Sequence, residues 1–558
     1  MEYKVKGIKK DRRYIKIFLP ILTIIPFLSF FLYFVILTPS PIYLLRSLIF
    51  DYKPKVIYET FKIYLDPSLP ENIKERVQEG VDDIVFNEIK RFEFVEKEDS
   101  DFVLGISDSK GEILVSKELV PVGHIYWITN SVKSDDIKEV LMEKDEYEFA
   151  NEYIQELWDV DVRLVESISL ELKASEGSIA LVYPSKISKD LKILSLDEGD
   201  LFKENDDSLL LSYALDGDLR SDFVSSIIKK NVTEFSSDTL QRDSVVKINM
   251  TGVTAISRGL AAKIDGSGNY AYPARDLGEF LADADLTHTS NEVSFVEGCA
   301  VYSGMRFCSR PEYIETLKAS GIDIVELTGN HNNDFGSQYN TKSIEMYKSL
   351  GWDYFGGGLN TKDSSKILYK EIKGSNIAFL GYNYYDSMLN TLAIAGESRA
   401  GSNHYSQSKL ESDIKEAKEN ADVVIVTFQF QECYSYPPSD VIYPICYKPL
   451  SSPDQKGVFR SAIDFGADVV VGTQAHQPQT YELYKEGVIF YGLGNLYFDQ
   501  YRWIGTRQGV VLSLYILEGK LIQTKLTATI YDRDLIPRVA NETESKLLLD
   551  LLKSARNF

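Results

Sequence analysis

The stretch ASGIDIVELTGNHNNDFG, residues 319–336, decides the predicted fold of this chain. A helix is expected to end at Gly321, because glycine readily adopts the left-handed backbone that closes a helix. The apolar run that follows predicts a buried strand, and polar residues gather just past its end. Proteins of the α/β class place ligands at the carboxyl ends of such strands. The stretch therefore predicts an α/β fold with a site at this strand end.

Two side chains in this stretch are candidates for the site. Asn330 offers an amide oxygen and His331 an imidazole, a pair suited to a divalent metal or a phosphoryl oxygen. Asp334 is placed to orient the histidine from behind. Taken alone, the stretch fits a structural loop equally well.

A second stretch, residues 466–499, repeats this pattern of a strand followed by a polar loop. Its loop carries Gln474 and His476, and the glycine-rich turn GLGN that follows ends in Asn495. The chain has only 5 histidines, yet His331 and His476 both come directly after a predicted buried strand. This coincidence favours a site over an isolated structural histidine.

The order of these motifs resembles the CapA-type poly-gamma-glutamate capsule synthesis proteins. GNHNNDFG comes first, then the strand TFQFQE with a loop containing Glu and Pro, then GTQAHQPQ and YGLGNLYFD, and the resemblance covers residues 245–535. It implies a calcineurin-like metallophosphoesterase fold, a four-layer sandwich of two sheets between helices. It also implies a role in making or anchoring an anionic surface polymer.

The resemblance implies roles for particular residues of this chain. Catalysis would fall to Glu292, His331 and His476, and metal binding to these three and Asn330. Substrate contacts would fall on Asn330, Gln429, Gln474 and Asn495.

Three positions depart from the pattern of the family. The family's first Gly-Asp reads Gly252-Val253, its strand-end histidine reads Gln429, and the first histidine of its G-x-H-x-H reads Gln474. A two-metal phosphoesterase needs a bridging carboxylate and several imidazoles, so we expect at most one divalent metal ion. An active phosphoesterase would need replacement ligands, for which Asp285, His288 and Asp499 are candidates.

The N-terminus predicts a membrane anchor. Residues 1–16 carry seven Lys and Arg, and Ile17–Thr38 has no charged residue. About 20 apolar residues span a bilayer as a helix, and the basic flank stays in the cytoplasm. We therefore expect residues 17–38 to be a single-pass signal anchor, with the bulk of the chain outside the cytoplasm. A cleaved signal peptide is the alternative, but its shorter apolar region and small-residue cleavage site are not evident.

Charge and cysteine content agree with an exported protein. A net charge of −22 argues against nucleic acid as a partner, because phosphate binding needs a basic surface. Four cysteines form two local pairs, Cys299 with Cys308 and Cys433 with Cys446. In an oxidising compartment, this spacing predicts two short disulfide loops, and no C-x-x-C spacing supports a metal-thiolate cluster.

The exported part is expected to form two domains. Residues 53–243 alternate β-rich and helical stretches, which predicts an α/β domain. The segment ALVYPSKISKDLKILSLD, a strand, a Pro turn and a second strand, faintly resembles the lobes of solute-binding proteins. A purely structural domain is the alternative, and His124 fits a packed residue better than a ligand. Residues 245–558 form the CapA-like domain.

The leading hypothesis is a membrane-anchored, extracytoplasmic CapA-like protein that acts in the synthesis, transfer or anchoring of poly-gamma-glutamate or a related capsule polymer. The expected partners are the anionic polymer or its precursor and membrane proteins of capsule synthesis. The alternative is a non-catalytic polymer- or ligand-binding protein with a degenerate metallophosphoesterase-like domain.

Overall fold

The structure is a computed structural model, and it describes residues 60–556 except for gaps at 68, 70, 83–84, 87–88, 91, 107–110, 128, 145–153, 155–159, 176, 198–201, 203–208, 218–221, 233–236, 301–303, 385–391 and 433–441. The predicted basic tail and anchor, residues 1–38, lie outside the described residues. In the part that is described, no helix is both long enough and apolar enough to cross a membrane.

The chain divides into two compact units. The smaller is Met1–Tyr64 with Val77–Val103 and Gly217–Ile228, and the larger is Leu65–Arg76 with Leu104–Asp216 and Lys229–Phe558. The predicted domain boundary near residue 244 stays a prediction.

The smaller unit holds a short parallel strand pair. Strand β1 (Phe61–Leu65) pairs with β4 (Phe92–Phe94), and the ring of Phe61 lies 5.8 Å from that of Phe92. The run NIKERVQEGVDDIVFNEI, residues 72–89, has the spacing of a helix. Helix α3 (Glu71–Asp82) ends before that run does, and the short strands β2 (Val85–Phe86) and β3 (Ile89–Lys90) follow.

The first part of the larger unit is built on the long strand β6 (Glu112–His124). It pairs in antiparallel fashion with β13 (Leu209–Gly217) and β10 (Ile179–Val182). Parallel pairing continues from β10 to β8 (Glu139–Glu143) and β9 (Asp161–Val165), and helix α6 (Ile168–Ala174) packs on this sheet.

One sequence prediction in this part is wrong. The run HIYWIT, residues 124–129, was expected to be a strand, but β6 ends at His124 and the chain turns. The amide of Trp127 donates to the carbonyl of His124, which closes the turn. The strand, Pro turn and strand predicted further on are confirmed as β10, the turn Pro184–Lys186 and β11 (Leu191–Ile193).

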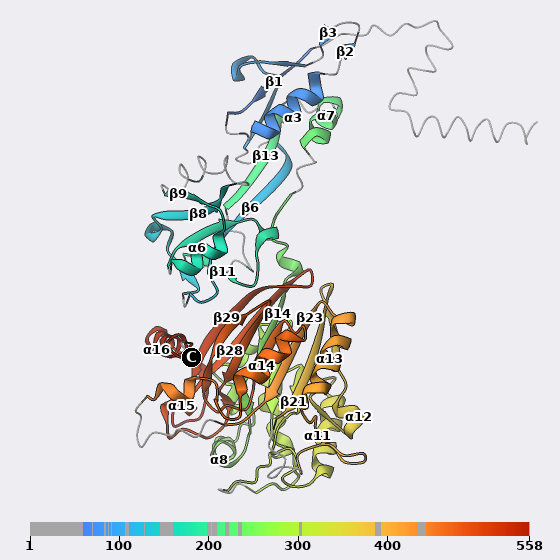
Figure 1. The fold of residues 1–558 in the computed structure, drawn as a ribbon, viewed down its shortest axis with the longest axis vertical. Coiled ribbons are helices and arrows are strands. Elements are labelled where there is room, and N and C mark those ends of the chain that lie inside the picture. The colour runs from blue at the N-terminus through green and yellow to red at the C-terminus, as the bar shows by residue number, and fades with distance from the viewer. Residues whose placement is uncertain are drawn as a thin grey trace, which may run out of the picture. The chain divides into compact units, whose positions relative to one another are not determined.

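Residues 246–555 of the larger unit contain two further sheets, as Figure 1 shows in green to red. The first has the order β18 (Asp353–Phe355), β17 (Ile324–Glu326), β16 (Leu286–Asn291), β14 (Val246–Met250), β28 (Gln508–Leu517), β29 (Lys520–Ile530) and β30 (Arg538–Val539). The second has the order β20 (Leu368–Ile372), β21 (Ser375–Asn383), β23 (Val423–Gln429), β24 (Val469–Gly472), β26 (Gly487–Leu493) and β25 (Pro478–Tyr484).

Alternation along the strands builds three hydrophobic cores. Successive strand residues point to opposite faces of a sheet, so neighbours in sequence enter different cores. In β17, Ile324 packs between the two sheets, whereas Val325 packs against helices on the outer face. In β23, Ile425 packs between the sheets and Val426 against the outer helices of the second sheet. The result is a stack of helices, sheet, sheet and helices.

The helical runs SRPEYIETLKASG and SSPDQKGVFRSAIDFG are predicted to end at their final glycines, and two outer helices do so. Helix α10 (Ile314–Ala319) and helix α14 (Gln455–Asp464) are followed by Gly321 and Gly466, both with positive φ. The first sheet is covered by α8 (Arg258–Ser267), α9 (Gly278–Ala282), α10 and α11 (Ser337–Ser349), and the second by α13 (Gln407–Asn420) and α14. The predicted mixed α/β class is confirmed.

The disulfide between Cys299 and Cys308 is confirmed. It closes the loop that carries Phe307, a residue in contact with His331. Cys446 is also disulfide-bonded, while Cys433 lies outside the described residues, so that pairing stays a prediction.

Removing the described disulfide is expected to lower the free energy of unfolding by about 2.5 kcal/mol, the loop-closure value for a loop of this length. The paired change Cys299→Ser with Cys308→Ser should show this shift in urea unfolding of the full chain without reductant. In the unchanged chain, reductant should remove the stabilisation that comes from the disulfide between Cys299 and Cys308. The double variant lacks this disulfide, so it has no such stabilisation to lose. An unfolding curve that does not move would contradict the expectation.

Candidate active site

The predicted site residues lie past the ends of strands from both sheets. Glu292 directly follows β16, and the loop after β17 carries Asn330 and His331. In the second sheet, Gln429 is the last residue of β23, and the loop after β24 carries Gln474. Strands β16 and β17 run parallel, as do β23 and β24, so within each sheet the carboxyl ends share one edge.

A buried chain of amides joins the two sheets. The amide nitrogen of Gln429 donates to Asn330 Oδ1 at 2.7 Å and to Gln474 Oε1. Its own oxygen accepts from Asn383 at the end of β21. Gln474 then donates to Glu432 Oε1 at 3.2 Å. Gln429 and Gln474 therefore each accept one hydrogen bond and donate another, and the donation from Gln474 ends at the carboxylate of Glu432.

His476 contacts the same oxygen of Glu432 that accepts from Gln474. Its Nε2 lies 2.9 Å from Glu432 Oε1 and its Nδ1 lies 2.8 Å from Asn495 Oδ1. Asn495 donates its nitrogen to the carbonyl of Thr506, so its oxygen is left as the acceptor for the imidazole. Both ring nitrogens therefore face acceptors, which favours the doubly protonated imidazolium. Burial alone would lower the pKa of His476, but the charge and hydrogen bond of Glu432 raise it to about 9.

Glu432 is the group that the sequence reading did not single out. Burial alone would raise the pKa of its carboxyl, but His476 and the other donors outweigh burial and lower the pKa. The carboxylate is therefore held in its ionised form. The residue stands three positions after the end of β23, in the quoted segment TFQFQE, so its position past a buried strand was the signal available.

His331 is held by its own loop. Its Nδ1 lies 2.7 Å from Asp334 Oδ2, which confirms the predicted orienting contact. The ring also packs on Phe307 at 4.2 Å between centroids. Burial alone would lower the pKa of His331, but the hydrogen bond of Asp334 and the charge of Glu292 raise it.

Glu292 is a buried carboxyl with an unused oxygen. Its side chain is 2% exposed, and Oε1 has no hydrogen-bond partner among the described residues. Burial raises the pKa of Glu292, and the charges of His331 and His476 oppose that rise. A carboxyl with a raised pKa and a free oxygen, beside two imidazoles, is equipped to accept and return a proton.

A cavity of about 470 Å³ opens onto this group of residues. His331, Glu432 and His476 line it from the protein side, and the rings of Phe307, Phe498 and Trp503 add apolar walls, with Arg258, Met305, Asp499, Gln500, Tyr501 and Arg502 completing the lining. Phe498 also stacks on His476 with 5.2 Å between ring centroids. The cavity therefore offers acid and base groups to a ligand that has both charged and apolar surface.

The three candidate replacement metal ligands, Asp285, His288 and Asp499, have other partners or lie elsewhere. Asp499 pairs with Arg258 and accepts from the amide of Gly259 at 2.9 Å. His288 is fully buried within β16, where its Nε2 lies 3.1 Å from Glu326.

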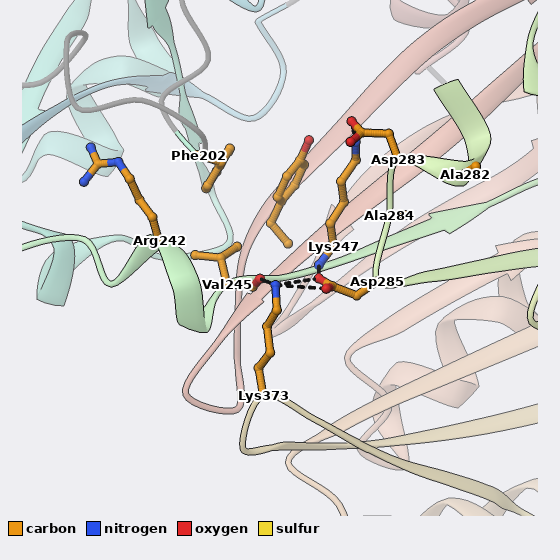
Figure 2. A pocket seen from close by; sticks show the side chains of 10 residues that line it. Phe202, Arg242, Val245, Lys247, Ala282, Asp283, Ala284, Asp285 and Lys373 are labelled. Carbon is orange, nitrogen blue, oxygen red and sulfur yellow. Dashed lines mark hydrogen bonds and ion pairs between the residues drawn. The ribbon is translucent and has the colours of Figure 1, made fainter. Parts of the chain in front are cut away.

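Asp285 stands at the opposite end of β16, in a second cavity of about 310 Å³. Figure 2 shows Lys373 reaching Asp285, at 2.9 Å, and Lys247 reaching Asp283, at 3.1 Å. Asp285 is therefore separated from Glu292 by the length of the strand.

The side chains present do not fit a centre of two metal ions. Val253 is buried where the family has an acidic residue, and Gln429 and Gln474 use their amides on each other. Among the described residues, no group of three or more His, Cys, Asp and Glu is arranged to hold a metal. The expectation of at most one divalent metal ion stays a prediction.

Comparison with known proteins agrees with this geometry. Residues 247–500 match the model of the bacterial capsule synthesis protein PGA_cap family. This portion of the chain, which contains Glu292, His331, Glu432 and His476, is similar to that family, and the resemblance predicted from the motifs is confirmed.

Two curated relatives carry capsule names. The chain is 31% identical to the capsule biosynthesis protein CapA of Bacillus anthracis, over 38% of this chain and 48% of that protein. It is 26% identical to the PGA biosynthesis protein CapA of Bacillus subtilis, over 44% of this chain and 61% of that protein. The chain thus spans about half to three-fifths of the length of these relatives.

A solved structure of a hypothetical protein from Thermus thermophilus is similar at 15% identity with a TM-score of 0.30, covering 50% of this chain and 98% of that one.

Proposed function

We propose that this protein is a membrane-anchored, extracytoplasmic protein that acts in the synthesis, transfer or anchoring of poly-gamma-glutamate or a related capsule polymer. The observation that carries the proposal is the meeting of His331, Glu432 and His476 at one cavity. The buried carboxyl of Glu292 interacts with both imidazoles, and all four residues lie within the portion that matches the PGA_cap family. The capsule names of the two relatives from Bacillus support the polymer class.

The proposed chemistry is proton transfer during formation or transfer of a polymer bond. Glu292 or His331 acts as the base. Burial raises the pKa of Glu292 and so brings that pKa closer to neutral pH. His476 holds a proton at neutral pH and acts as the acid, with Glu432 stabilising the imidazolium. Asn330, Gln429, Gln474 and Asn495 position these groups or bind the polymer.

The finer features of the fold are part of the same proposal. The stack of helices and two sheets fits a metallophosphoesterase-like sandwich, and residues 53–243 fit either a solute-binding-like or a structural domain. Residues 17–38 supply the anchor, with the N-terminus in the cytoplasm. The expected partners are the anionic polymer or its precursor and membrane proteins of capsule synthesis, and not nucleic acid.

A genetic complementation experiment tests this proposal. In a strain that lacks this gene, the full chain should restore surface polymer, measured after acid hydrolysis as released glutamate. A chain with His331→Ala and His476→Ala should fail, while a chain with the exposed histidine changed, His404→Ala, should restore polymer fully. Normal polymer in the strain lacking the gene would overturn the proposal.

The alternative is a binding protein without catalysis. It is favoured by Gln429 and Gln474, which stand in place of two histidines, because an amide moves no proton at neutral pH. In that case, variants that keep the shape of Glu292 but not its acidity should still restore polymer.

At most one divalent metal ion is expected per chain, because the donors needed for a second are absent from the site. Elemental analysis of the full chain, purified in detergent and dialysed against buffer free of metal, should find one equivalent or less. Restoring the acidic residue with Val253→Asp is the matched comparison. Two equivalents in the unchanged chain would contradict the expectation.

A further inference from the structure

A separate small cavity lies elsewhere in the larger unit, and the described residues that line it include no carboxylate. Its volume is about 130 Å³, and its lining consists of His124, Tyr126, Trp127, Leu172, Lys173, Gly177, Ser178 and Arg556. In a chain of net charge −22, a cavity with two cationic side chains and no Asp or Glu in its described lining is unusual. Its local charge favours an anion.

Arg556 lines the cavity and carries a donor without a hydrogen-bond partner among the described residues. Its guanidinium carbon lies 4.0 Å from the centroid of Tyr126 and 5.4 Å from that of Tyr481, so the group is held against two rings. Nη1 is buried and has no hydrogen-bond partner among the described residues. A buried charged donor without an acceptor is unfavourable, and an anion would satisfy it. The planar guanidinium is suited to carboxylate and phosphate oxygens.

His124 adds a neutral donor of defined direction. Its Nδ1 accepts from the amide of Tyr126 at 3.2 Å, so in the neutral ring the proton is on Nε2. Burial lowers the pKa of His124, and Lys173 and Arg556 lower it further, while Asp190 opposes them. Asp190 is itself engaged by the hydroxyls of Ser169 and Ser188.

Lys173 supplies the second positive charge. It lies on helix α6, is exposed, and makes no hydrogen bond or ion pair with any residue that the structure describes. Lys173 lines the same cavity as His124 and Arg556. The hydroxyl of Ser178 also lines the cavity.

We infer that this cavity is a binding site for a small oxyanion, either phosphate or a carboxylate, held by Arg556, Lys173 and the Nε2 proton of His124. The volume is sufficient for one such group with water. The site lies outside the cavity of Glu292 and His476 and is independent of the function proposed for it.

Isothermal titration of the full chain in detergent, with inorganic phosphate in one series and acetate in another, tests the inference. Binding of at least one of them is expected, and the stronger of the two identifies the source of the oxyanion. Lys173→Gln should weaken binding about tenfold, since an exposed side chain can be changed without loss of the fold. The matched control Lys263→Gln, an exposed lysine on α8, should leave the affinity unchanged.

Arg556→Lys gives a second readout, because it keeps the charge and removes the planar fork. It should weaken phosphate or acetate binding while the far-ultraviolet circular dichroism of the chain is retained. Absence of heat with both anions up to about 10 mM, in the affinity range of weak ligands, would overturn the inference. So would binding that Lys173→Gln and Lys263→Gln weaken equally.

Discussion

Replacing Glu292 with glutamine is expected to lower the amount of polymer formed per unit time by at least about a hundredfold, the range for loss of a positioned acid or base. Glutamine keeps the size of the side chain and its hydrogen bonding but cannot exchange a proton. The measurement is polymer formed by membranes that contain the full chain, at matched protein levels.

The same change should not lower stability, which separates a catalytic role from a structural one. Glu292 is buried with one unpartnered oxygen, so the neutral amide removes the desolvation penalty of a carboxylate. The thermal midpoint of Glu292→Gln should equal or exceed that of the unchanged chain. Full polymer formation by this variant would leave the binding alternative as the better account.

Replacing Glu432 with glutamine is expected to lower the pKa of His476 from about 9 to its ordinary value or below, because the negative charge that raises it is lost while burial remains. With only 5 histidines in the chain, the imidazole signal can be followed by NMR titration. The exposed change Glu416→Gln is the matched control and should leave the titration of His476 unchanged.

This pKa also predicts how stability depends on pH. The folded pKa of His476 is raised above the unfolded value of about 6.5, so its contribution is fully present below pH 6.5 and is lost as pH rises through about 9. The shift corresponds to roughly 3 kcal/mol. Urea unfolding at pH 6 and pH 10 should show this loss in the unchanged chain and little of it in Glu432→Gln. Equal pH dependence in both would contradict the pairing.

Much of the fold followed from local patterns. Gly321 and Gly466 ended helices as predicted, because the positive φ that each adopts is easy for glycine and strained for other residues. Short continuous apolar runs predicted the buried strands β17, β23 and β24. The turn after His124 was missed, since a short run of apolar and aromatic residues is compatible with either a strand or a turn packed inside the protein.

The sequence by itself determined which strands are buried, which residues follow their ends, and where the family motifs depart at Val253, Gln429 and Gln474. These features are local, and they depend on residue type and spacing.

Only the tertiary structure decided that Glu432 belongs to the site, and that Asp285 lies at the far end of β16. It also decided that the raised pKa of His476 comes from a carboxylate 44 residues away in sequence. The physical reason is that electrostatic and hydrogen-bond energies depend on distances in space and are strengthened by burial. Spacing along the chain specifies neither the distance between two groups nor their burial.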